Sequence, residues 1–277
     1  RTVSLSNSGV TVGTYPKVNV DTYGRVTYGY GSINLTTDVS NILPITYGGT
    51  NNNTFSDGQV VYYNGTKLIG NNNLYWDYTN SKLGIGTSSP NQQLEITGNF
   101  RLPNTTSTGT YGVIYKGGSP FIHDFNYGNN GTVTTSGANT FIGINAGNFT
   151  MGSTATEAYH ASFNTGIGNG ALHANTTGFY NTALGHVSLY SNTTGYWNTA
   201  IGFYSLFYNT IGNYNTALGL SALHSNTTGS YNTALGMYSG RFIADGTTGN
   251  TASSSSTYLG YNTKALADGD TNETVIG

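Results

Sequence analysis

Eleven acidic residues and five histidines are the side chains of this sequence that could catalyse a reaction or bind a metal. Hydrolysis of a glycosidic bond needs two carboxylates roughly 5–10 Å apart. Only two sets of acids are candidates for such a pair, Asp268/Asp270/Glu273 and Asp124/Glu157. The first set also offers oxygen ligands for calcium, but its spacing is not that of an EF-hand loop. We expect turn residues there, and no catalytic site, metal or cofactor.

Two of the histidines share a position in a repeated pattern. His173 and His224 occupy the place that Tyr190 and Phe207 hold in the units between them. A column of stacked rings that mixes His, Tyr and Phe is typical of a packed or subunit-facing surface. We therefore assign no metal to these histidines.

The pattern itself is a run of seventeen-residue units. Successive units begin NTGIG, NTALG, NTAIG, NTALG and NTALG, at Asn164, Asn181, Asn198, Asn215 and Asn232. Repetition at a fixed short period is the signature of a stacked architecture. Seventeen residues make about 4.7 helical turns, so an apolar helix face would rotate away from its neighbour in each unit. The Gly residues and Asn-Thr pairs of every unit also favour turns.

Each unit is therefore predicted to be one coil of a parallel β-solenoid, with equivalent residues of successive coils about 4.8 Å apart. Two apolar columns should point inward, Ile167/Leu184/Ile201/Leu218/Leu235 and Leu172/Leu189/Leu206/Leu223. An aromatic column should close each coil at Tyr180, Trp197, Tyr214 and Tyr231. The first-position asparagines should form a ladder of side-chain amides.

The repeat continues on both sides of this block. NTFIG at Asn139 precedes Asn164 by twenty-five residues, and STYLG at Ser256 follows Asn232 by twenty-four. ETVIG at Glu273 follows Ser256 by seventeen. We therefore predict a solenoid over residues 139–277, with loop insertions near 150–159 and 241–254.

The residues before the solenoid predict small β modules. Residues 1–50 include VTVGTYPKVNVDTYGRVTYGYG, an alternating run that turns at Asp-Thr-Tyr-Gly as a β-hairpin does. Residues 51–138 form a shaft or linker region of short strands, expected at 59–63, 68–69, 74–78, 82–86 and 94–97. These modules have too little apolar sequence for separate cores, so we expect them to be buried against other copies of the chain.

Composition and charge exclude several classes of protein. Aromatic residues make up 13% of the chain and charged residues 7%, whereas disordered chains lack aromatics and are usually charged. No Asp, Glu, Lys or Arg lies between Ala158 and Gly240, so the coils cannot neutralise phosphates and we expect no nucleic-acid partner. No run of 18 apolar residues is present, so we expect no membrane insertion.

Several stretches resemble the modular tail fibres of bacteriophages. GTYPKVNVDTYGRVT over 13–27 is similar to a shaft module of pattern GTY-x-KV-x-VD-xx-GRVT. LPITYGGT over 43–50 and LGIGTSSP over 83–90 resemble the LP-x-x-x-GGT and LGIGT-x-x-P segments of such fibres. The NTALG coils resemble the β-roll heads of trimeric autotransporter adhesins, which have a shorter period. The resemblance implies an elongated homotrimeric fibre. A segment like 272–277 often leads into a self-cleaving chaperone domain there, so we expect an excerpt of a longer protein.

The resemblance predicts a structural and attachment protein without enzyme activity, the distal part of a virion tail fibre that recognises a bacterial surface receptor outside the cell. Its implied partners are further copies of itself, other tail proteins of the virion, and a bacterial surface glycan or outer-membrane protein. One alternative is a bacterial trimeric surface adhesin. Another is an ice-binding solenoid, because Thr recurs at the second position of the units. Ice binding favours a flat Thr-x-Thr face, whereas the units offer Asn-Thr and Thr-Thr.

Receptor binding is predicted at the variable positions of the coils. Positions six, seven, ten and eleven vary toward aromatic residues while the frame of each unit stays fixed. Rings beside Asn and Thr are typical of a site for a neutral glycan, and packing between subunits is the alternative. The candidate receptor-facing residues are His173, Tyr190, Phe203, Tyr204, Phe207, Tyr208 and His224.

Overall fold

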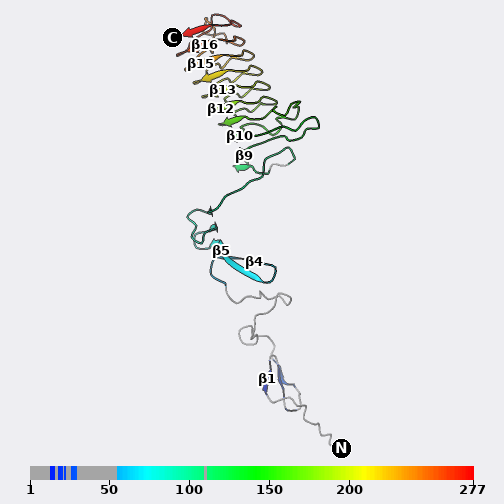
Figure 1. Cartoon of the computed structure of the whole chain (residues 1–277). Helices are drawn as coiled ribbons and strands as arrows, with labels where there is room; N and C mark the ends of the chain where they lie inside the picture. Colours follow the sequence, from blue (N-terminus) through cyan, green and yellow to red (C-terminus); the bar gives the residue numbers. More distant parts are fainter. Residues whose placement is uncertain (1–12, 16–17, 21, 23–25, 30–54, 109–110) are drawn as a thin grey trace, which may run out of the picture. The chain divides into compact units, whose positions relative to one another are not determined.

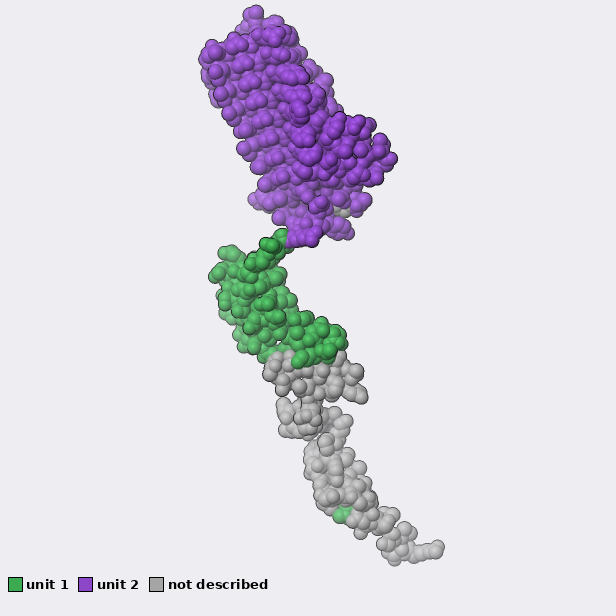
Figure 2. Space-filling view, in the orientation of Figure 1, with its two compact units in different colours: residues 1–100 green, residues 101–277 purple. Residues whose placement is uncertain are grey.

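A computed structural model of the 277-residue chain describes residues 13–15, 18–20, 22, 26–29, 55–108 and 111–277. These residues form strands and turns and no helix, which confirms the predicted all-β class. Within them, no helix long and apolar enough to cross a membrane occurs. The chain divides into two compact units, residues 1–100 and residues 101–277 (Figure 2).

The first unit begins with a three-stranded antiparallel sheet. Its strands are β1 (Gly13–Tyr15), β2 (Val18–Val20) and β3 (Val26–Gly29), paired in that order. The pairing of β2 with β3 confirms the hairpin predicted around Asp-Thr-Tyr-Gly. The LPITYGGT segment lies outside the described residues.

A second sheet of this unit orders β4 (Gln59–Tyr63), β5 (Leu68–Asp77), β6 (Lys82–Ile85) and β7 (Leu94–Ile96). We expected two strands here, at 68–69 and 74–78, with an Asn-Asn-Asn turn between them. The structure has one continuous strand instead, β5. The asparagines fit within a strand because their side chains find local partners. Asn71 Oδ1 accepts the backbone N–H of Asn73 at 2.7 Å. Gln59 Nε2 donates to Asn72 Oδ1 at 2.9 Å.

The second unit is built on a ten-stranded sheet in the order β17 to β8. β8 (Ile114–Lys116), β9 (Ser119–His123) and β10 (Thr140–Ile142) pair antiparallel in sequence. From β10 to β17 the strands stack one after another along the unit (Figure 1). Every pair is parallel and in register, with Thr182 beside Thr199 and Thr199 beside Thr216. These later strands are β11 (Thr165–Ile167), β12 (Thr182–Leu184), β13 (Thr199–Ile201), β14 (Thr216–Leu218), β15 (Thr233–Leu235), β16 (Thr257–Leu259) and β17 (Thr274–Ile276). Such regularly spaced parallel strands define a solenoid-like fold.

The inward side of these strands is not the one predicted. In β12, β13 and β14 the central alanines Ala183, Ala200 and Ala217 are fully buried, whereas Leu218 is 43% exposed. The predicted Ile167/Leu184/Ile201/Leu218/Leu235 column is therefore wrong: its leucines are exposed and its isoleucines half-buried. Because side chains alternate along a strand, position-two Thr and position-four Leu share the outer face. The coil interior is thin, and the small residue at position three leaves room for the leucine at position nine.

The second predicted column is confirmed. Its four leucines belong to one continuous core and are at most 1% exposed: Leu172, Leu189, Leu206 and Leu223. Full burial of a leucine side chain stabilises a fold by about 1.5–3 kcal/mol relative to exposure. This column therefore carries the hydrophobic stabilisation of the coils.

Two asparagine ladders connect the coils. The first-position ladder is confirmed, with Asn198 Nδ2 donating to Asn181 Oδ1 at 3.2 Å and Asn215 Nδ2 to Asn198 Oδ1 at 3.1 Å. A second ladder, which we did not predict, occupies position twelve: Asn175, Asn192, Asn209 and Asn226, joined by amide bonds of 2.9 Å. The ladders meet at a glycine carbonyl, because Gly195 O accepts from Asn181 at 2.8 Å and Asn192 at 2.9 Å. Buried amides are thereby satisfied in the core.

Candidate functional site

The variable positions of three successive coils line an open groove in the second unit. We call it the Phe207 groove, and its volume is about 470 Å³. Five of the seven predicted receptor-facing residues line it, Phe203, Tyr204, Phe207, Tyr208 and His224, together with Leu220, Ser221, Tyr238 and Arg241. The structure thus brings together side chains from units that the sequence lists seventeen residues apart.

The backbone positions these side chains through two residues of the coil that adopt left-handed (positive φ) conformations. Tyr204 has a φ of 59° and Leu206 a φ of 50°, and both flank the buried Ser205. Ser205 fixes the corner because its Oγ donates to Ala217 O of the next coil at 3.1 Å. Leu206 points into the core, whereas Phe203 and Tyr208 are 45% and 49% exposed. The same corners recur in the neighbouring coils, so like positions form columns.

The tenth position forms a continuous stack of rings. Neighbouring centroids lie 5.0 Å apart for His173 and Tyr190, 5.3 Å for Tyr190 and Phe207, and 5.6 Å for Phe207 and His224. Their planes differ by 18°, 10° and 11°. His173 and Tyr190 extend this stack beyond the groove lining. Every predicted receptor-facing residue therefore lies on the column or beside it.

Tyr204 and Tyr208 are oriented differently from the stack. The ring of Tyr208 lies at 89° to that of Phe207, and the ring of Tyr204 is tilted by 60° from that of Phe207 at a centroid distance of 4.9 Å. Neither tyrosine therefore stacks parallel to the column, and Tyr208, which is 49% exposed, leaves part of its ring surface accessible in the groove. A sugar ring packs its C–H groups on such a face while the phenol hydroxyl supplies a hydrogen bond, because Tyr combines an apolar body with a polar end.

Arg241 is a groove residue that the sequence analysis missed. It stands at position ten of the coil that begins at Asn232, directly after His224 in the column, but we had placed it in the insertion near 241–254. Its guanidinium carbon lies 5.0 Å from the ring centroid of Tyr238 and 4.7 Å from that of Phe242. The uncharged block between Ala158 and Gly240 suggested a groove without charge. Arg241 shows instead that the groove contains one positive charge. Counting ten residues from Asn232 would have found this residue.

His224 is held in its neutral form. Burial, and after it the positive charge of Arg241, lower the pKa of His224 from 6.5 to about 4. Its Nδ1 is buried and has no hydrogen-bond partner among the described residues. The imidazole thus lines the groove without adding a second positive charge at neutral pH.

This depressed pKa predicts a pH-dependent stability. Between pH 6.5 and about 4 the unfolded chain binds a proton at His224 that the folded chain does not, so stability should fall as the pH falls through this window. His224→Phe, which places the ring that Phe207 has at the same position, should reduce this loss. Thermal unfolding midpoints at pH 7 and pH 4.5 measure the effect. A variant with the pH dependence of the wild type would contradict the assignment.

A second aromatic groove, the Trp197 groove, was not predicted as a site. Its volume is about 330 Å³, and it is lined by Tyr159, Phe179, Tyr180, Tyr196, Trp197 and Tyr214. The predicted closing column is stacked in part, with Tyr214 and Tyr231 at 4.8 Å and 6°, but Trp197 is 48% exposed. The missed signal is the aromatic residue at position sixteen, since Phe179 and Tyr196 stack at 4.7 Å.

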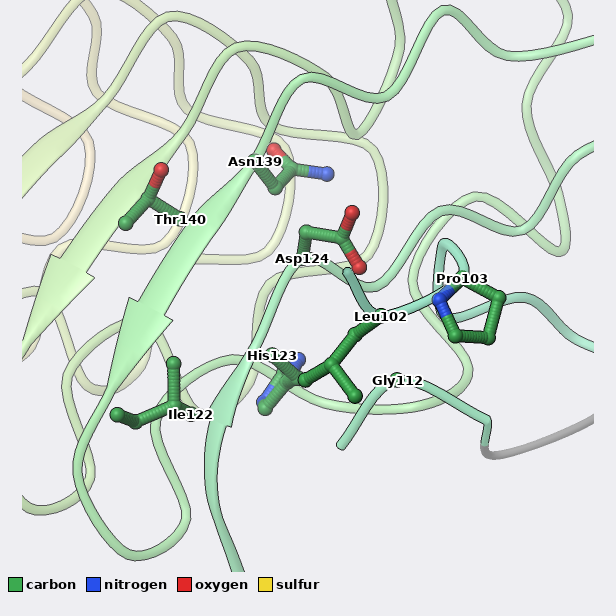
Figure 3. Close-up of a pocket in the computed structure, with 8 residues that line it drawn as sticks. All are labelled: Leu102, Pro103, Gly112, Ile122, His123, Asp124, Asn139 and Thr140. Carbon is green, nitrogen blue, oxygen red and sulfur yellow. The ribbon is translucent and has the colours of Figure 1, made fainter. Parts of the chain in front are cut away.

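Asp124 and one further histidine, His123, serve the fold. Figure 3 shows a pocket lined by His123 and Asp124 at the end of β9, with Asn139 and Thr140 opposite. His123 Nε2 lies 2.9 Å from Ala146 O, and Asp124 Oδ1 accepts the Thr105 N–H at 2.9 Å. Both side chains are thus engaged within the protein.

The acidic set near the end of the chain fixes turns between coils. Asp268 accepts the backbone N–H groups of Thr251 and Ala252 at 2.7 and 2.9 Å. Glu273 accepts from Leu266 N–H at 2.7 Å and from the Tyr258 hydroxyl at 3.0 Å. Within the described part of the chain, no three His, Cys, Asp or Glu side chains form a group that could hold a metal ion.

Comparisons with known proteins leave the function to be argued from this geometry. No protein-family model, curated protein or solved structure matches the chain. What the fold and the site define is a class: an all-β repeat protein whose coils present two aromatic grooves.

Proposed function

We propose that this chain is an attachment protein, the distal part of a bacteriophage tail fibre, and that its Phe207 groove binds a saccharide of the bacterial surface. The observation that carries this proposal is the gathering of five predicted receptor-facing side chains around one open groove. The ring of Tyr208, which is 49% exposed and perpendicular to Phe207, suits a sugar face, because stacking needs an accessible aromatic surface. The tail-fibre context and the location on the virion rest on the shaft-like segments over 13–27, 43–50 and 83–90.

The outer face of the coil strands supports the proposed assembly as a homotrimer. Threonine and leucine share this face, and three of its leucines are 39–43% exposed: Leu218, Leu235 and Leu259. A contiguous apolar ladder of this kind is unusual for a free surface. It carries no charge between Ala158 and Gly240, so like-charge repulsion does not oppose contact between copies. The number of three copies comes from the resemblance to fibres.

The proposed binding site is tested by removing its rings. Changing Tyr204, Phe207 and Tyr208 together to Ser should lower adsorption of the purified chain to susceptible bacteria about tenfold or more, because three ring contacts are lost. Adsorption is measured by fluorescence of labelled protein on a panel of strains. Unfolding midpoints must stay close to the wild type for the comparison to count.

A matched triple variant serves as the control. Tyr180, Trp197 and Tyr231 are exposed rings of the other aromatic column, and their change to Ser should leave adsorption within about twofold. If the control loses adsorption and the Phe207-groove variant does not, the Trp197 groove is the site. Equal adsorption by all three proteins would place the receptor site outside both grooves.

A further inference from the structure

The groove holds a cation that has no anionic partner within the described residues. None of the side-chain N–H donors of Arg241 is hydrogen-bonded there, and its Nε is buried. The nearest acid along the sequence, Asp245, is occupied with Thr247 N–H at 2.8 Å and Thr248 N–H at 2.7 Å. No Asp or Glu occurs between Ala158 and Gly240 that could compensate the charge from the coils.

The position of this guanidinium is fixed by its surroundings. The rings of Tyr238 and Phe242 lie within 5.0 Å of its central carbon, at distances typical of cation–π contact. The backbone is also held, because Arg241 O accepts the N–H of Asn250 at 3.0 Å. A positioned Arg presents a rigid fork of donors, which matches the two oxygens of a carboxylate.

The adjoining histidine supplies a second polar group at the same end of the groove. His224 and Arg241 occupy position ten of successive coils and both line the groove. The Nδ1 of His224, like the Nε of Arg241, is buried without a partner in the described part of the chain. Polar atoms buried in this way are uncommon, and each indicates a group that a ligand or water completes.

We infer that the Phe207 groove recognises an acidic saccharide, whose carboxylate binds Arg241 beside His224 while a neighbouring sugar ring packs on Tyr204 or Tyr208. This inference rests on the proposed saccharide-binding function and replaces the neutral glycan expected from the sequence. One Arg and a neutral imidazole suit a singly charged, planar group. A hexuronic acid within a surface polysaccharide has this chemistry.

The test compares saccharides that differ only in the charged group. Oligosaccharides that contain hexuronic acid, their carboxyl-reduced forms and phosphate-substituted oligosaccharides are titrated into the full chain by calorimetry. We expect the carboxyl-reduced forms to bind about 10- to 100-fold more weakly, as loss of a charge-assisted hydrogen-bonded pair predicts. The affinity of the acidic forms should also fall between 50 mM and 500 mM NaCl, because salt screens the pair.

Variants separate this inference from the proposed function. Arg241→Gln should abolish the preference for the acidic form but keep binding of the reduced form, and Arg241→Lys should restore part of the preference. The triple Ser variant of Tyr204, Phe207 and Tyr208 should lose both forms. Equal binding of both forms by wild type and Arg241→Gln overturns the carboxylate assignment and leaves the saccharide groove standing, as does a preference for the phosphate forms. Binding of none of them overturns the acidic-saccharide inference, whereas the proposed function is decided separately by the adsorption of the ring variants to bacteria.

Discussion

Leu206→Asp should prevent the coils from folding. Leu206 is 0% exposed, in a column with a buried leucine directly on either side. The change removes a leucine side chain, which costs about 2–5 kcal/mol, and leaves a carboxylate buried without a partner at a further cost of several kcal/mol. The total rivals the 5–15 kcal/mol by which an entire domain is stable. We expect loss of soluble protein and of the β-sheet signal in circular dichroism.

Leu218→Asp is the matched control, because it makes the same substitution on the outer face. Leu218 is 43% exposed, so the coil should keep its fold and its unfolding midpoint should change little. If the outer face is the contact between copies, this variant should instead shift the mass in solution from the trimer toward the 29.2 kDa monomer. Loss of folding in Leu218→Asp and tolerance of Leu206→Asp would reverse the assignment of inside and outside. A wild-type mass near that of the monomer would contradict the trimer.

Asn198→Asp should also be strongly destabilising, although it changes only one heavy atom of the side chain. Asn198 Nδ2 donates to Asn181 Oδ1 at 3.2 Å and to Gly212 O at 2.8 Å. Its Oδ1 accepts the Nδ2 of Asn215 at 3.1 Å. A carboxylate would place an oxygen against the two acceptors in a fully buried site. Two lost donors and a buried charge should cost about 3–5 kcal/mol, measured by urea unfolding.

The expected pH dependence identifies the cause of this loss. Burial beside two acceptors raises the pKa of a carboxyl at this site above its unfolded value near 3.9, because the protonated form can donate one hydrogen bond. The gap in unfolding free energy to the wild type should therefore narrow as the pH falls through the folded pKa. Asn169→Asp, at an exposed position of the first coil, should stay within about 0.5 kcal/mol of the wild type. A similar loss at both sites would show that the ladder is not the reason.

Several features of the fold could be predicted because they depend on local repetition. The seventeen-residue period and the opening Asn-Thr pair recur in all five units, leucine holds position nine in the first four, and equivalent residues of stacked coils must face one another. That requirement alone places His173, Tyr190, Phe207 and His224 in one column and the first-position asparagines in one ladder. The same argument predicts the strands, since the opening Asn of each coil is followed by Thr, then Ala or Gly, then Leu or Ile.

Only the tertiary structure decided which face of each strand is buried, because the alternation of side chains along a strand allows either face to point inward. A Thr-Ala-Leu strand has two faces, and its most apolar residue is a natural choice for the core, yet the interior admits Ala217 beside Leu223 and turns Leu218 outward. The space inside a coil, which no single unit encodes, settles that choice. Arg241 lines the groove for a related reason. The fifth coil stays in register with the fourth up to position ten, and the inserted loop begins only after that position. The sequence thus determined the columns, and packing determined which columns form the core and which form the candidate site.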